Sequence, residues 1–148
     1  MRPAILFVLL AAFGAAPRPL HADLRMVMAE QDLGKRSKLA LDNAEAALKS
    51  AREAYNNDQK DRLKAAVEEL LESVNLASDS LKATGKNPRR SPKWFKQAEI
   101  ATRDLLKRMD TFQHDMNFDD RNVLDKAKAR TQEVHDELLL GLMEGRKK

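Results

Sequence analysis

The sequence predicts an all-α protein, an up-down-up-down antiparallel four-helix bundle that follows an N-terminal signal peptide. After residue 22, apolar residues recur at alternating steps of three and four, the spacing of one face of an α-helix. Beyond that point proline occurs only at Pro88 and Pro92, so long helices can run uninterrupted elsewhere. Short connections place successive helices antiparallel, and a bundle is their natural closure. A pair of extended helical hairpins that dimerises is the alternative architecture.

The first 22 residues have the pattern of a secretory signal peptide. Arg2 gives a positive start, an apolar run covers residues 4–16, and the small residue Ala22 precedes a polar helix. We therefore expect residues 1–22 to be the signal peptide and residues 23–148 to form one bundle domain in the periplasm or outside the cell. The apolar run is shorter than the roughly 18 to 20 residues of a membrane span, which disfavours an uncleaved anchor.

Charge and cysteine content exclude several function classes. Without Arg2 and Arg18 the chain has 25 basic and 23 acidic residues, so its net charge is +2 and not +4. This near balance disfavours a nucleic-acid-binding protein. The absence of cysteine from the sequence excludes disulfides, thiolate metal sites, c-type haem attachment and a lipid-anchored form. No further segment is apolar enough to span a membrane, so we expect a protein that is not transmembrane after cleavage.

Each of the four expected helices places one stripe of apolar or small residues on its inner face. The second stripe has the cleanest heptad spacing. The expected inward residues are Leu33, Ser37, Leu41, Ala44, Leu48, Ala51 and Tyr55 in the first helix, Leu63, Val67, Leu70, Val74, Ala77 and Leu81 in the second, Trp94, Ala98, Ala101, Leu105, Phe112 and Met116 in the third, and Leu124, Ala127, Thr131, Val134 and Leu138 in the fourth.

The helix ends follow from residues with defined capping roles. The first helix is expected to run unbroken over residues 23–56, with Gly34 as a weak point that costs about 1 kcal/mol relative to alanine. Asp58 is expected to cap the second helix and Gly85 to end it. Ser91 is the expected cap of the third helix, with proline next to it at the first helical position.

The fourth helix carries two further expectations. Phe118 precedes the expected cap Asp119 and should pack on Val123 as a hydrophobic staple. Five of the six residues from Leu138 to Met143 are large and apolar, more than one stripe needs. We expect this tail to be buried against Trp94 and the first helix, because bulky groups often close the end of a bundle. An exposed contact patch is the alternative.

The most unusual stretch is residues 82–98, which is strongly basic and contains no acid. Its cations crowd the start of the third helix, where the helix dipole is already positive and acids are preferred. A helix N-terminus with nearby arginines suits an anion, so we predict a contact site for an anionic lipid, a glycan or an acidic protein. A solvated basic loop is the alternative. The residues of this predicted site, which we call the basic corner, are Lys86, Arg89, Arg90, Lys93 and Trp94.

The sequence contains no recognisable catalytic or metal-binding motif. His114 and His135 have no Glu-x-x-His partner of the kind that di-iron bundles use, and we expect both to be surface residues. There is no Gly-x-Ser-x-Gly motif and no glycine-rich phosphate loop. We therefore expect a protein that is not an enzyme and that holds no metal.

Two short stretches resemble a known family. The expected mature start, Ala22-Asp23-Leu24 with Met28 soon after it, is similar to the opening of the periplasmic b-type cytochromes built on a four-helix bundle. The basic stretch that ends in Ser91-Pro92 is similar to their connection between the second and third helices. The resemblance implies haem b with Met28 as one ligand. The family's histidine ligand near the end of the fourth helix is missing here, and Met143 would have to replace it.

The preferred interpretation is an exported, non-catalytic binding or scaffold protein of the cell envelope, monomeric or homodimeric and without a cofactor. It would contact an anionic partner through the basic corner. The alternatives are a haem-binding electron-transfer protein and an envelope chaperone that uses an exposed apolar face. Salt-sensitive binding, a visible absorption band and suppression of aggregation would distinguish the three.

Overall fold

The computed structural model describes residues 21–144, and these residues are helical almost throughout. The prediction of an all-α chain with four long helices is confirmed, and no strand occurs within the described range. Residues 1–20 of the predicted signal peptide lie outside the described residues. The elements are α1 (His21–Met28), α2 (Leu33–Asn56), α3 (Lys60–Ala83), α4 (Lys93–Asp115), the 3₁₀ helix η1 (Phe118–Leu124) and α5 (Asp125–Met143).

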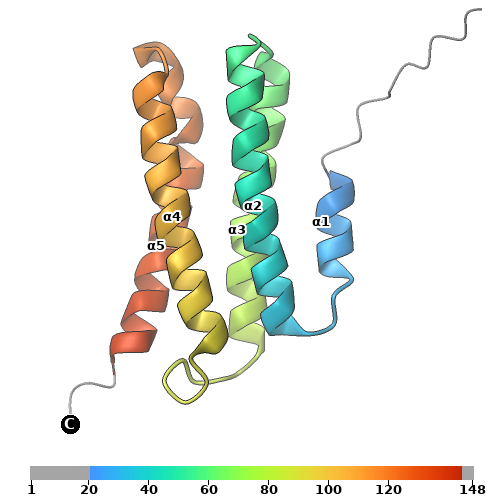
Figure 1. Cartoon of the computed structure of the whole chain (residues 1–148), viewed down its shortest axis with the longest axis vertical. Helices are drawn as coiled ribbons and strands as arrows, with labels where there is room; N and C mark the ends of the chain where they lie inside the picture. Colours follow the sequence, from blue (N-terminus) through green and yellow to red (C-terminus); the bar gives the residue numbers. More distant parts are fainter. Residues whose placement is uncertain (1–20, 145–148) are drawn as a thin grey trace, which may run out of the picture.

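The four long helices lie side by side, with their connections at the helix ends (Figure 1). Helix α2 packs on α3 and α4, and α5 packs on α4 and α3, so the four helices form a closed ring. Helices α2 and α5 do not touch within residues 21–144 and lie diagonally across this ring. The short α1 packs against the outside of α2 and α3, mainly through Leu24 and Val27.

The predicted inner stripes form the core. All six residues of the predicted second stripe, on α3, are buried, and so are all five of the predicted fourth stripe, four on α5 and Leu124 at the end of η1. Leu33, Tyr55, Trp94 and Ala101 are only partly buried, since they lie near helix ends or at the margin of the core. Burial of the remaining residues stabilises the fold by the usual hydrophobic contribution, about 25 cal/mol per Å² of apolar surface.

Small residues bring α2 and α3 together, and this helix pair makes the most extensive contact in the structure. Asn43 on α2 donates hydrogen bonds to Ser73 Oγ (2.9 Å) and Glu69 Oε1 (3.2 Å) on α3. Ala40 and Ala47 lie three and four residues from Asn43, so they share its face of α2. Both alanines are buried. Short side chains on this face allow the close approach of the two helices.

The expectation of one unbroken first helix is wrong. The chain leaves the helix after Met28 and starts a new one at Leu33. Asp32 caps α2, because its side chain accepts a hydrogen bond from the backbone N–H of Lys35 (2.8 Å). The Glu30 side chain accepts from the Asp32 N–H (3.1 Å). This turn folds α1 back along α2 (Figure 1).

The other helix ends follow the predictions in part. Gly85 follows α3 with a φ of 63°, the left-handed conformation that glycine adopts after a helix, which confirms its role. Asp58 does not cap α3, because it has a φ of 53° itself and Gln59 occupies the cap position. The cap of α4 is Pro92, one residue later than expected from Ser91.

The staple predicted at Phe118 is wrong. The chain forms the 3₁₀ helix η1 before α5, and this tighter turn directs Phe118 into solvent with 82% of its surface exposed. The guanidinium of Arg121 lies 6.0 Å from the centre of the Phe118 ring. None of the helices within residues 21–144 is long and apolar enough to cross a membrane.

Candidate functional site: the basic corner and the groove beside it

The loop between α3 and α4 is held in shape by its own hydrogen bonds. Thr84 Oγ1 donates to the Leu81 carbonyl (2.6 Å) and accepts from the N–H of Lys86 (3.2 Å). Asn87 Oδ1 accepts from the N–H of Arg89 (2.9 Å). The Asn87 carbonyl accepts from the N–H groups of Arg90 and Ser91. Since polar side chains of the loop satisfy its backbone, its basic side chains are left to project outward.

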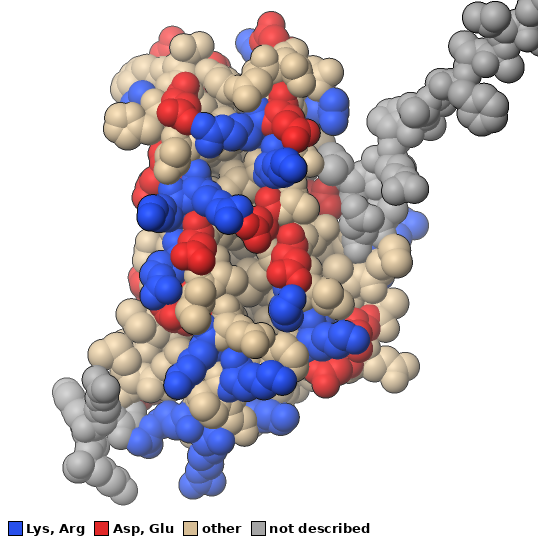
Figure 2. Space-filling model, viewed as in Figure 1, with Lys and Arg blue, Asp and Glu red and all other residues tan. Residues whose placement is uncertain are grey.

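The structure keeps the predicted basic corner together at one end of the molecule. Lys86, Arg89, Arg90 and Lys93 are exposed, and Trp94 is partly buried. Figure 2 shows Lys and Arg gathered at the lower end, where the α3–α4 loop lies. The side chains of Lys86, Arg90 and Lys96 make no ion pair with any acid among residues 21–144. Their charge is therefore directed toward solvent.

Trp94 anchors this corner to the start of α2. Its indole lies directly on Gly34, so closely that a Cβ on Gly34 would fall within 3.0 Å of the ring atoms. The Lys93 ammonium lies 4.6 Å from the centre of the same indole. Gly34, expected to be a weak point of the helix, is therefore the residue that makes room for Trp94.

The contact between Gly34 and Trp94 brings two further cations to this end, which sequence reasoning missed. Lys35 Nζ pairs with Glu30 Oε2 at 3.0 Å, and Arg36 Nε donates to the Glu30 carbonyl at 2.7 Å. The hydrogen bond from Lys35, helped by the backbone N–H of Asp32, holds the pKa of Glu30 below its ordinary value. The signal available in the sequence was the Lys35-Arg36 pair beside Gly34, but only the fold places it near residues 86–94.

The start of α4 is open to an anion. Within residues 21–144 no side chain accepts a hydrogen bond from the first N–H groups of this helix, and its first turn contains no acid. These N–H groups and the helix dipole favour negative charge. Lys93 and the exposed arginines of the loop add full positive charges next to them. The arrangement can therefore attract a phosphate, sulfate or carboxylate group through both backbone and side-chain donors.

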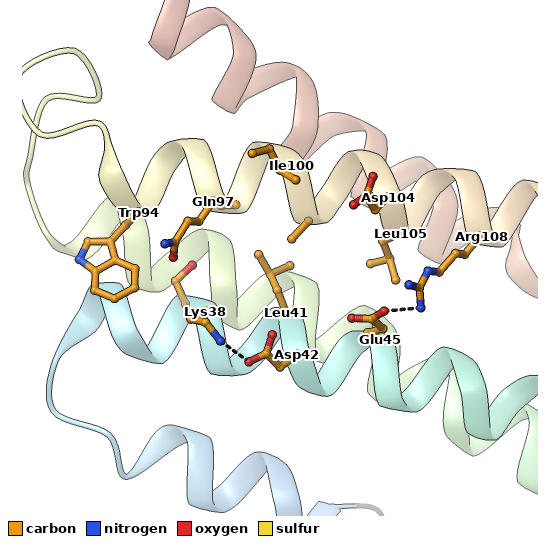
Figure 3. A pocket seen from close by; sticks show the side chains of 13 residues that line it. Lys38, Leu41, Asp42, Glu45, Trp94, Gln97, Ile100, Asp104, Leu105 and Arg108 are labelled. Atoms are coloured by element: carbon orange, nitrogen blue, oxygen red, sulfur yellow. Dashed lines mark hydrogen bonds and ion pairs between the residues drawn. The ribbon is translucent and has the colours of Figure 1, made fainter.

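A groove between α2 and α4 begins at Trp94 (Figure 3). It has a volume of about 350 Å³, and Leu41, Ala98 and Leu105 line its apolar floor. A second hollow of about 760 Å³ continues it along the same two helices as far as Phe112. Ion pairs neutralise its edges, since Lys38 pairs with Asp42 at 2.7 Å and Glu45 pairs with Arg108. The groove therefore offers apolar surface with little net charge.

The two methionines implied by the cytochrome resemblance are not brought together. Met28 ends α1 with 58% of its surface exposed, and Met143 ends α5 with 52% exposed. Helices α1 and α5 share no contact within the described residues. The structure therefore does not place two thioether sulfurs at a common haem site.

The expectation of a surface histidine holds for His114, which is exposed, but is wrong for His135. His135 is packed between α5 and α4 with only 13% of its side chain exposed. Its Nδ1 lies 3.2 Å from Thr102 Oγ1 and 3.9 Å from Glu99 Oε1. The same ring nitrogen of His135 faces both Thr102 and Glu99, whereas a catalytic triad uses one nitrogen for the nucleophile and the other for the carboxylate. Thr102 is also fully buried, so these three residues do not form a catalytic triad. No cluster of three metal-binding side chains occurs within residues 21–144.

The expected burial of the α5 tail is also wrong. Leu138 is buried, but Leu139, Leu140 and Met143 are exposed by 39%, 60% and 52%. Only one side of the tail meets the protein, where a Cβ on Gly141 would lie 3.2 Å from Pro88 Cγ. A helix with apolar residues all round cannot bury every side against a single neighbour.

Comparisons of the chain with models of protein families, with curated proteins and with solved structures find no match. The resemblance to b-type cytochromes therefore stays a prediction. The function has to be argued from the geometry of the basic corner and the surfaces beside it.

Proposed function

We propose that this chain is an exported, non-catalytic binding protein of the cell envelope that contacts an anionic partner through the basic corner. The observation that carries the proposal is the set of exposed cations beside the uncapped start of α4. Three of them, Lys86, Arg90 and Lys96, have no acid partner within residues 21–144. Cations that are not neutralised inside the protein remain available to a partner.

The way the corner is mounted supports the same function. Trp94 packs into the space left by Gly34, and the hydrogen bonds of Thr84 and Asn87 hold the loop. A preorganised set of donors loses less conformational entropy on binding than a flexible tail would. Some surface cations elsewhere are paired with acids, for example Lys38 with Asp42, whereas residues 82–98 contain no acid that could neutralise the corner from within its own segment. The basic corner is therefore the best candidate for recognition of an anion.

The proposal includes the topology and the location. The connections at alternate ends of the four long helices favour an up-down-up-down order in which successive helices are antiparallel, while α2 and α4, whose starts meet at Gly34 and Trp94, are parallel neighbours. The positive start, apolar run and small residue of the first 22 residues favour export. Mass spectrometry of the protein recovered from an expressing cell tests export, because cleavage after Ala22 leaves Asp23 as the new N-terminus.

Retention of the protein on immobilised heparin, eluted with a salt gradient, tests the basic corner. We expect the parent to be retained and the double variant Arg89→Ala, Arg90→Ala to elute at clearly lower salt, because screened ionic contacts carry the binding. The matched control is Lys60→Ala with Lys126→Ala, which removes two exposed cations near the starts of α3 and α5. Circular dichroism must show equal helicity in all variants. Equal retention of the two double variants would reject the basic corner as the site.

A chaperone is the second candidate, because the structure exposes apolar side chains at the end of α5 and an apolar groove beside α2. This function predicts that the protein suppresses aggregation of an unfolded client at low and high salt alike, since apolar contacts are not screened. Binding through the basic corner predicts no such suppression.

A further inference from the structure

The end of α5 exposes apolar surface beside the basic corner. Leu140 and Met143 are more than half exposed, and neither belongs to the hydrophobic core of the described chain or to the partly buried residues packed against it. Exposed large apolar side chains that lie close together mark a surface that meets another apolar phase. Leu138 and Leu142 from the same segment are instead packed against the core, which fixes the orientation of this helix end.

The fold joins this apolar tail to the basic loop. A Cβ on Gly141 would lie 3.2 Å from Pro88 Cγ, so α5 approaches the α3–α4 loop at the centre of the basic stretch. Leu138 and Pro88 also line one small cavity of about 120 Å³ between α5 and that loop. Figure 1 shows the end of α5 and the α3–α4 loop at the same end of the molecule.

The charges at this end favour a negatively charged apolar phase. The nearest acid on α5, Glu137, is paired with Lys82 at 2.9 Å. Glu144 directly follows the tail and adds one negative charge at this end. At least three cations at the same end have no acid partner among residues 21–144, so positive charge is in excess. A glycan or a soluble acidic protein would explain the cations but leaves Leu140 and Met143 unused. An anionic bilayer surface uses both, since its headgroups attract Lys and Arg while its acyl boundary accepts apolar side chains.

We infer that this end of the molecule docks end-on to the surface of an anionic lipid bilayer, with Leu140 and Met143 entering the headgroup boundary and the basic corner contacting the lipid phosphates. The inference rests on the proposed function and names its partner. Trp94 lies beside the contact and reports it by fluorescence, because an indole moved into a less polar environment emits at shorter wavelength. The helices then stand upright on the membrane, with η1 facing away from it.

The test is co-sedimentation of the protein with vesicles, using the form that the expressing cell produces. One set of vesicles contains phosphatidylcholine alone, and the other contains phosphatidylcholine and phosphatidylglycerol in equal parts. The parent and the variants carry the same N-terminal segment, so a difference in binding between them does not come from residues 1–22. We expect binding to the anionic vesicles only, with a blue shift of the Trp94 emission. Lys86→Ala with Arg90→Ala should weaken binding about 25-fold, since each cation near an anionic membrane contributes about a factor of five.

The tail variant Leu140→Ser, Met143→Ser distinguishes binding to a bilayer from binding to a soluble polyanion. We expect it to weaken vesicle binding about tenfold, because apolar side chains no longer enter the boundary, and to leave heparin retention unchanged. Phe118→Ser is the matched control, since it removes an exposed apolar residue from η1. It should change neither measurement.

The outcomes distinguish the inference from the function on which it rests. Heparin retention without vesicle binding, or vesicle binding that the tail variant does not weaken, overturns bilayer docking and leaves a soluble anionic partner. Equal binding to both kinds of vesicle also overturns it, because the cations would then play no part. Absence of both heparin retention and vesicle binding rejects the proposed function itself.

Discussion

Gly34 and Trp94 are in direct contact across the α2–α4 interface, and the indole occupies the space that any side chain at position 34 would need. The contact joins the starts of two helices that are separated by 60 residues of sequence. It also fixes the orientation of the first turn of α4, next to which the cations of the basic corner lie. The geometry of the proposed site therefore depends on a residue that carries no side chain.

Gly34→Ala should destabilise the protein although alanine is the better helix former. The gain in helix propensity is about 1 kcal/mol, and the cost of forcing a methyl group against the indole is about 1 to 3 kcal/mol. Denaturant unfolding followed by circular dichroism measures the net change. In a Trp94→Ala background the same substitution should stabilise the protein by about 1 kcal/mol, because the clash is removed. The same sign in both backgrounds would contradict the contact.

Ala47→Leu should destabilise the protein strongly, because a larger side chain must separate α2 from α3. Overpacking of a close helix interface costs about 1 to 3 kcal/mol, occasionally more. Ala46→Leu is the matched control on the neighbouring, exposed position of α2 and should change the free energy of unfolding by no more than about 0.5 kcal/mol. A comparison of the two variants by thermal unfolding is sufficient. Equal unfolding temperatures would mean that α2 and α3 are not closely packed at Ala47.

The turn between α1 and α2 should loosen in acid. The folded-state pKa of Glu30 is lowered, so its ionised form stabilises the fold above the ordinary pKa of glutamate. This contribution is lost as the pH falls through the lowered value. The measurement is the hydrogen-exchange protection factor of the Asp32 amide, which donates to Glu30, as a function of pH. The protection factor divides the intrinsic exchange rate at each pH by the observed rate. In Glu30→Gln the acid-induced change should disappear, and its persistence would assign the effect to another group.

A haem titration of the purified protein should give no saturable Soret band. Met28 and Met143 are both exposed and lie on helices that do not touch within the described chain, so no paired axial ligands are in place. Visible absorption measures the result, with Met28→Ala in parallel. A sharp band at one haem per chain that is lost in Met28→Ala would instead establish the b-type cytochrome reading.

Hydrophobic periodicity was sufficient to predict the four helices and most of their core, because the positions of the buried residues repeat within each helix. The stripe from Leu63 to Leu81 is buried as expected. The break before Leu33 was missed, because residues 29–32 contain no proline or glycine that would mark it and the Asp32 cap is a single local hydrogen bond. The 3₁₀ helix before α5 was missed for the same reason, since Asp119 also suits the start of an α-helix.

The candidate site was only partly predictable. The basic stretch is visible in the sequence, because its cations lie close together in one segment that contains no acid. The contact of Trp94 with Gly34, and the approach of Gly141 to Pro88, join residues far apart in sequence, and no local pattern indicates them. The sequence shows that the α5 tail has more apolar residues than one stripe needs, but only the fold shows that Leu140 and Met143 are the ones left more than half exposed.

The most direct test of the central claim is an NMR titration of the isotope-labelled protein with inositol hexakisphosphate, a soluble polyanion. We expect saturable, salt-sensitive shifts that concentrate in the amides of residues 86–96 and in the indole N–H of Trp94. The amides of η1 and of the start of α5 serve as internal controls and should not move. Shifts centred on those control residues, or no saturable shift anywhere, would contradict the assignment of the basic corner as the binding site.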